Sequence, residues 1–160
     1  SAAGIRDFDI CFKGLGLTKG KHHTGHGGGQ NGMDYAGVYH FIRRFHFEQI
    51  AKLCKRLESI PEGDGTMLDN TVIVYLSDGA EAHHSRTWEW PFIMIGDAGG
   101  KLKAGRYVDY PGYGMLGHRT TANLYTTFLN LAGHPAERFG MADPNLKDLD
   151  QTGPLTELLA

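Results

Sequence analysis

The sequence predicts an α/β fold with a mostly parallel sheet. A run of β-branched and apolar residues, 71–76, is typical of a strand buried on both faces of such a sheet. A helical apolar pattern precedes it over 39–60, and a turn separates the two. Directly after Leu76 the chain changes to acidic and imidazole side chains, at the edge where open α/β sheets bind ligands. Helix, turn and buried strand together form one α/β unit.

The composition narrows the class of protein. A chain of 160 residues with 41% hydrophobic content is consistent with one domain and a core. The net charge of -2 gives no reason to expect nucleic acid as a partner. No apolar run approaches the length of a membrane span. The two cysteines, Cys11 and Cys54, are as consistent with separate buried thiols as with a disulfide.

Each predicted element has its own signal. In 39–60 the apolar positions recur at helical spacing, and Pro61 ends the helix because proline disrupts the turn before it. The run 91–96 predicts a second buried strand, and 101–113 predicts a short hairpin or an irregular segment. Thr120 or Thr121 caps a second helix, which a following glycine and proline end.

The predicted domain organisation has three parts. Residues 1–20 form an N-terminal segment in which the alternation over 8–12 suggests an edge strand. Residues 21–140 form the α/β domain. Residues 141–160 are rich in Asp, Asn, Gly and Pro, so we expect a surface tail.

Candidate metal ligands gather in two predicted loops. The first loop, 21–32, which we call the histidine loop, is poor in apolar residues. It contains three histidines: His22, His23 and His26. A disordered, tag-like tract is the alternative interpretation of this segment. The second loop supplies Asp78 and His84. Neutral imidazole and carboxylate suit a divalent metal, and zinc leads the candidates, followed by manganese, iron and calcium.

Two further residues are candidates for binding an anionic substrate. Arg86 lies beside the adjacent histidines 83 and 84, where its guanidinium suits a bidentate contact with a phosphate or sulfate group. His118 precedes a predicted helix whose N-terminus favours anions. On an extended segment the two adjacent histidines point in opposite directions, so we expect only one of them to ligate an ion. For Asp78 the alternative is a turn cap. The sequence contains no Gly-x-Ser-x-Gly elbow, which argues against a serine hydrolase.

Several short motifs in one order carry a resemblance to a known family. They are Phe47-Glu48-Gln49-Ile50, the turn 61–70, Tyr75-Leu76-Ser77-Asp78-Gly79, His83-His84, Trp90-Pro91-Phe92 and 99–107. Over about residues 21–140 the chain resembles the C-terminal half of an exported bacterial family of unknown function. That family looks like a distant branch of the alkaline phosphatase and sulfatase superfamily.

The resemblance implies a doubly wound, mostly parallel, alkaline-phosphatase-like sheet with metal ions at the strand ends. Asp78 matches the metal-binding aspartate of the superfamily, and His84 matches a later histidine ligand. The histidine loop matches an earlier ligand loop, with histidine in place of the usual aspartate. Gly79 stands where many members have a ligand. The superfamily's nucleophile and first metal-binding aspartate come from an N-terminal half, and this chain has no equivalent of either.

The expected function is therefore a metal-dependent, hydrolase-like protein acting on phosphate or sulfate esters. Either the chain is a fragment of a longer protein that supplies the missing residues, or its active centre is incomplete. The alternative is a catalytically inactive, metal-stabilised binding or assembly module of the same fold. The expected partner is a small anionic ester, or in the alternative another protein, including the family's N-terminal half or a partner chain. The resemblance also implies a periplasmic or otherwise exported location.

Overall fold

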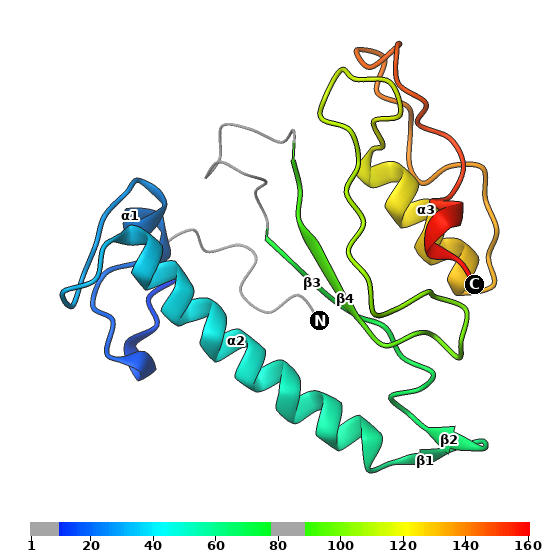
Figure 1. Ribbon diagram of the computed structural model, residues 1–160. Coiled ribbons are helices and arrows are strands. Elements are labelled where there is room, and N and C mark those ends of the chain that lie inside the picture. The colour runs from blue at the N-terminus through cyan, green and yellow to red at the C-terminus, as the bar shows by residue number, and fades with distance from the viewer. Residues whose placement is uncertain (1–9, 78–88) are drawn as a thin grey trace. The chain divides into compact units, whose positions relative to one another are not determined.

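The computed structural model describes residues 10–77 and 89–160. Within these ranges it contains three α-helices and two short antiparallel sheets of two strands each (Figure 1). The chain divides into two compact units, residues 1–56 and 57–160. Each unit has its own hydrophobic cluster.

The first unit is organised around the start of the long helix α2 (Tyr35–Glu58). Asp34 caps this helix, because its Oδ1 accepts a hydrogen bond from the Gly37 N–H at 2.8 Å. The predicted helix over 39–60 is thus confirmed, although it starts earlier than its apolar pattern shows. Among the described residues, no helix combines the length and apolar character that a membrane span requires.

A short 3-10 helix, η1 (Lys13–Leu15), and the one-turn helix α1 (Lys21–Gly25) precede α2. The small core of this unit is formed by buried apolar side chains from the segment after η1 and from α2: Leu17, Val38 and Ile42. No strand forms over 10–12, and residues 1–9 lie outside the described ranges. Both cysteines are free thiols, and the Cys11 Sγ donates to the Leu17 carbonyl at 3.2 Å.

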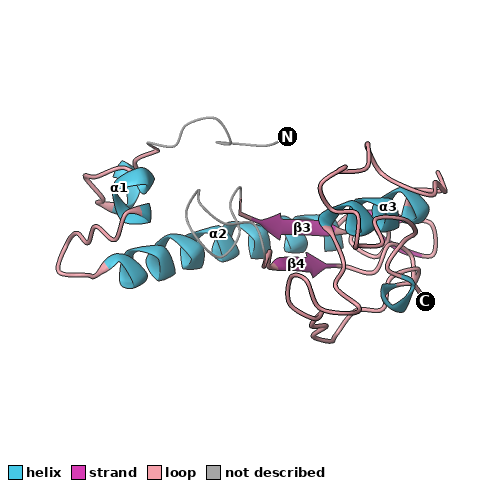
Figure 2. Ribbon diagram, turned by 90° about the horizontal axis from the view of Figure 1, so that it is seen from above, coloured by secondary structure: helices cyan, strands magenta, loops and turns pink. Residues whose placement is uncertain are grey.

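The second unit contains both sheets. The strands β1 (Pro61–Glu62) and β2 (Gly65–Thr66) form a tight hairpin after α2. The strands β3 (Ile73–Leu76) and β4 (Phe92–Ile95) then pair antiparallel, with Val74 opposite Met94. Figure 2 shows these two arrows side by side and pointing in opposite directions.

The predicted doubly wound, mostly parallel, alkaline-phosphatase-like sheet was wrong. Both predicted strands exist, but they form a two-stranded antiparallel pair. The prediction that the strands are buried on both faces was also wrong, because none of their residues is fully buried and Leu76 and Ile93 are exposed. An apolar run indicates extended chain without indicating its direction. The connection over 77–91 is long enough for a crossover between parallel strands and equally for a wide return loop, so its length did not decide between them.

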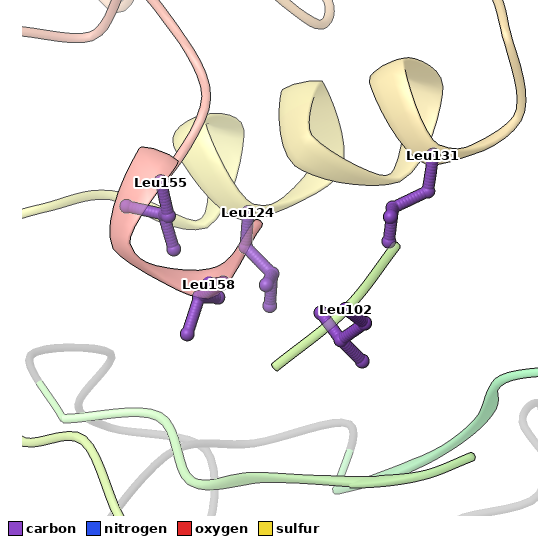
Figure 3. Packing of buried hydrophobic residues seen from close by; sticks show 5 residues of the cluster. All are labelled: Leu102, Leu124, Leu131, Leu155 and Leu158. Atoms are coloured by element: carbon purple, nitrogen blue, oxygen red, sulfur yellow. The ribbon is translucent and has the colours of Figure 1, made fainter. Parts of the chain in front are cut away.

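Phe92 and Met94 of β4, with Val72 just before β3, pack against a core formed by α3 (Thr121–Leu131), the loop after β4 and the C-terminal segment. Figure 3 shows the leucines that form this core, which come from the loop after β4, from α3 and from the last residues of the chain: Leu102, Leu124, Leu131, Leu155 and Leu158. We expected residues 141–160 at the surface. Their first ten residues are mostly exposed, whereas Leu155 and Leu158 are buried, the latter in the 3-10 helix η2 (Thr156–Leu158).

Polar side chains of α3 attach the C-terminal segment to this helix. Asn123 is fully buried, and its Nδ2 donates to the carbonyls of Thr152 at 2.8 Å and Gly153 at 3.1 Å. Its Oδ1 accepts from the Thr120 N–H at 2.8 Å, which completes a capping box. The Oγ1 of Thr127 accepts from the Leu155 N–H at 2.8 Å. We call the side chains of Asn123, Thr126 and Thr127 the polar clamp.

We expect Asn123→Ala to lower the free energy of unfolding by about 2 to 3 kcal/mol, because it leaves two carbonyls and one N–H without their partner in a buried site. The matched control is Asn130→Ala, whose Nδ2 bonds only the Thr126 carbonyl within the same helix. The control should lose about 1 kcal/mol or less. Urea unfolding of both variants tests this, and equal losses would contradict a special role for Asn123.

Candidate functional site

The histidine loop is fixed by the buried side chain of Gln30. The Oε1 of Gln30 accepts from the N–H groups of Thr18 at 2.9 Å and Lys19 at 3.0 Å. Its Nε2 donates to the Lys19 carbonyl at 3.2 Å. Because these contacts join the chain before α1 to the chain after it, they hold the helical turn that carries the histidines.

A tight turn at residues 30–33 supports the same closure. The backbones of Gln30 and Met33 exchange two hydrogen bonds of 3.0 Å, and Asn31 between them has a positive φ of 55°. Asparagine tolerates this conformation better than most residues, and Gly32 follows it at 73°. The Nδ2 of Asn31 donates to the Gly16 carbonyl at 2.9 Å. The segment predicted as a loop is therefore an ordered turn around a short helix.

Two of the three histidines in this loop lie together. The rings of His22 and His26 have centroids 4.6 Å apart and planes at 76°. Residues four apart on a helical turn lie on one face, which explains the contact. A tetrahedral zinc ion bound to one nitrogen of each ring would hold the centroids roughly 5 Å apart. The pair is thus close to the separation that one shared ion requires.

His23 occupies a different place. A Cβ atom at Gly28 would overlap its imidazole ring, so the ring rests against the backbone of a residue that has no side chain. At the neighbouring Gly29, an added Cβ would instead overlap the Met33 carbonyl oxygen. The first glycine therefore accommodates His23, and the second allows the 30–33 turn to approach.

The other two predicted ligands, Asp78 and His84, and the predicted anion contact Arg86 lie outside the described residues. The flanks of their loop are described, and there the Trp90 Nε1 donates to the Ser77 carbonyl at 2.9 Å. Within 10–77 and 89–160, no group of three or more histidine, cysteine or acidic side chains has a geometry that could hold a metal ion.

His118 is described and lies two residues before the capping residue of α3. Its Nδ1 is 2.9 Å from the Pro111 carbonyl oxygen, and its ring meets the Tyr113 ring edge to face at 5.7 Å. Because a carbonyl only accepts, this bond requires the proton on Nδ1. The Nε2 of the neutral ring then carries the lone pair, as in histidines that bind metals or accept protons.

The second unit also contains a charged cluster that the sequence did not indicate, formed by Arg106, Tyr110, Arg119 and Glu157. Burial is the main cause that raises the pKa of Tyr110, and the neighbouring Glu157 carboxylate adds to the effect. Burial alone would raise the pKa of Glu157, but the Tyr110 hydroxyl and the guanidinium groups of Arg119 and Arg106 outweigh it and lower that pKa. Tyr110 makes no hydrogen bond of good geometry with a described residue, so we interpret its contact with Glu157 as electrostatic. Arg119 also lies 3.6 Å from Asp150. No sequence spacing predicts this cluster, because its members come from three distant segments.

His46 on α2 is the titratable histidine of the first unit with a perturbed environment. Its ring lies 5.5 Å from the Phe12 ring. Burial lowers the pKa of His46, and the positive charge of Lys21 at the start of α1 lowers it further. The folded protein therefore favours the neutral imidazole.

Comparison of the chain with protein-family models, with curated proteins and with solved structures gave no match.

The environment of His46 predicts a pH dependence of stability. The pKa of His46 in the folded protein lies below the ordinary value of about 6.5. The stability that depends on the neutral His46 ring is therefore fully present above a pH of about 6.5 and is lost as the pH falls through the folded pKa. We expect the thermal midpoint of wild type to fall more steeply than that of His46→Gln between about pH 7 and pH 5. A control variant, His40→Gln, changes an exposed histidine of the same helix and should keep the wild-type slope. Parallel slopes for wild type and His46→Gln would contradict the assignment.

The two neighbouring glycines predict different costs for the same substitution. Gly28→Ala displaces only the exposed His23 ring, so we expect a stability change within about 0.5 kcal/mol. Gly29→Ala pushes against backbone at the 30–33 turn and should cost about 1 to 3 kcal/mol. Chemical denaturation of both variants measures this difference. The nuclear magnetic resonance signals of the His23 ring should shift in Gly28→Ala. A loss of stability in Gly28→Ala as large as that in Gly29→Ala would refute the interpretation.

Proposed function

We propose that this chain is a metal-dependent, hydrolase-like protein that acts on phosphate or sulfate esters, and that His22 and His26 hold its divalent ion. The observation that carries the proposal is the 4.6 Å separation of these two rings on one helical turn. Imidazole is a borderline ligand, so zinc is the first candidate, ahead of manganese, iron and calcium. A bound cation would polarise the ester oxygen and lower the pKa of a bound water.

The supporting residues differ in their role. Gln30 fixes the backbone of the turn that carries the pair. The pair supplies two ligands, and a tetrahedral site needs at least one more. Asp78 and His84 are candidate ligands on the sequence alone, and Arg86 and His118 are candidate anion contacts. The resemblance to the superfamily supports the ester chemistry, whereas the fold gives it no support.

A second function deserves a test, because the sequence contains no residue that corresponds to the superfamily's nucleophile. In this alternative, the same ion stabilises a binding or assembly module that does not turn over esters. Both functions require the metal, and only the first requires catalysis. Ester turnover by the metal-loaded protein therefore separates them.

We expect wild-type protein to retain about one or two transition ions after exhaustive dialysis, and His22→Ala/His26→Ala to lose them. His40→Ala is the matched control because it removes an exposed histidine from α2. Elemental analysis of the three proteins measures the effect. If the double variant keeps its metal, the ligand assignment fails.

The same samples then test the reaction with aryl phosphates and aryl sulfates. Turnover that disappears in the double variant supports the hydrolase. Metal binding by the pair without turnover of either ester contradicts the hydrolase and leaves the binding module.

A further inference from the structure

The most positively charged short segment of the second unit is 101–107, which we call the basic segment. It contains Lys101, Lys103 and Arg106 within six positions, and all three side chains are exposed. Clusters of this kind are typical of proteins that bind polyanions. None of the described carboxylates forms a salt bridge with any of the three.

The backbone presents the two lysines on one side. Leu102 between them is only 4% exposed and packs into the leucine core. The Lys103 N–H donates to the Leu158 carbonyl at 2.9 Å, and the Lys101 carbonyl accepts from Ala160 at 2.9 Å. Because alternate side chains of an extended segment point to opposite faces, anchoring Leu102 inward turns both lysines outward. The pairing with the C-terminal segment keeps them in place.

Arg106 is held beside the lysines. Its Nε donates to the Lys103 carbonyl at 3.1 Å, and its Nη2 donates to the Glu157 carbonyl. Tyr107 follows, and 87% of its surface is exposed, which is unusual for an aromatic residue in an ordered segment. The segment thus combines three cations with one flat apolar ring.

We propose that the basic segment binds a sulfated polysaccharide. Sulfate groups along such a chain match the cations, and an arginine can donate two hydrogen bonds to the oxygens of one sulfate. The exposed ring of Tyr107 offers a surface on which a sugar ring can pack. The proposal does not depend on the metal site or on ester hydrolysis.

Two observations limit the affinity of the basic segment for a polyanion. The net charge of the chain is -2, which repels a sulfated chain and a nucleic acid alike, so the attraction must come from the segment itself. The acidic residues Asp97 and Asp109 flank the segment, so its positive charge is confined to a few residues. We therefore expect binding that weakens strongly with salt.

The test is surface plasmon resonance with immobilised heparin, and with chemically desulfated heparin beside it, at about 50 mM salt. We expect wild type to bind the sulfated chain only. Lys101→Ala/Lys103→Ala should bind roughly tenfold more weakly. The matched control is Lys52→Ala/Lys55→Ala, which removes two exposed lysines from α2 and should stay within about twofold of wild type.

Tyr107→Ala separates packing from charge. It should bind several-fold more weakly while keeping the salt dependence of wild type, because it removes no charge. The proposal is overturned if wild type does not bind heparin, or if both lysine pairs contribute equally. It is also overturned if Tyr107→Ala binds as tightly as wild type, or if single-stranded DNA binds as tightly as heparin with the same loss in the variant.

Discussion

A buried side-chain amide closes each of the two units, and the rest of each unit depends on it. In the second unit, Asn123 bonds both the cap of α3 and the C-terminal segment. In the first unit, Gln30 bonds the chain on the far side of α1. An amide suits this task because it donates and accepts at one site, so it can satisfy buried N–H and carbonyl groups of irregular chain. Where the chain forms little regular structure, hydrogen bonds from these side-chain amides take the place of the backbone hydrogen bonds of a sheet.

This explains why the leucine core forms although the sheet beside it is small. A two-stranded hairpin is marginal alone and needs a layer against one face. Here that layer consists of α3 and the last residues of the chain, with Leu155 and Leu158 buried against Leu124. The C-terminal segment has no strand of its own beyond the single bridge of Leu102 to Leu159. Its position therefore rests on the polar clamp, which places the two leucines in the cluster that Phe92 and Met94 of β4 pack against.

The sequence was most informative where local chemistry decides the structure. The apolar spacing of α2, Pro61 after it and the Thr120 cap of α3 are local signals, and these elements formed near their predicted bounds. The strands 73–76 and 92–95 were also predictable, because β-branched and apolar runs favour extended chain. Their antiparallel direction and their partial exposure were not, since an apolar run gives neither the direction of a strand nor the number of its faces that are covered. The burial of Leu155 was equally hidden, because its N–H is bound by the Thr127 hydroxyl, far away in the sequence.

The candidate site follows the same division. Helical spacing of His22 and His26 is enough to explain their contact, but the sequence also offered His23 as an equal third ligand. Helical spacing puts His22 and His26 on one face of the turn and His23 on another. The His23 ring lies against the backbone of Gly28, which gives glycine at that position a steric reason. A pair on a fixed turn binds an ion only with ligands from elsewhere. The chemistry of this segment thus depends on which further residues reach it, and that is a property of tertiary structure which no local spacing encodes.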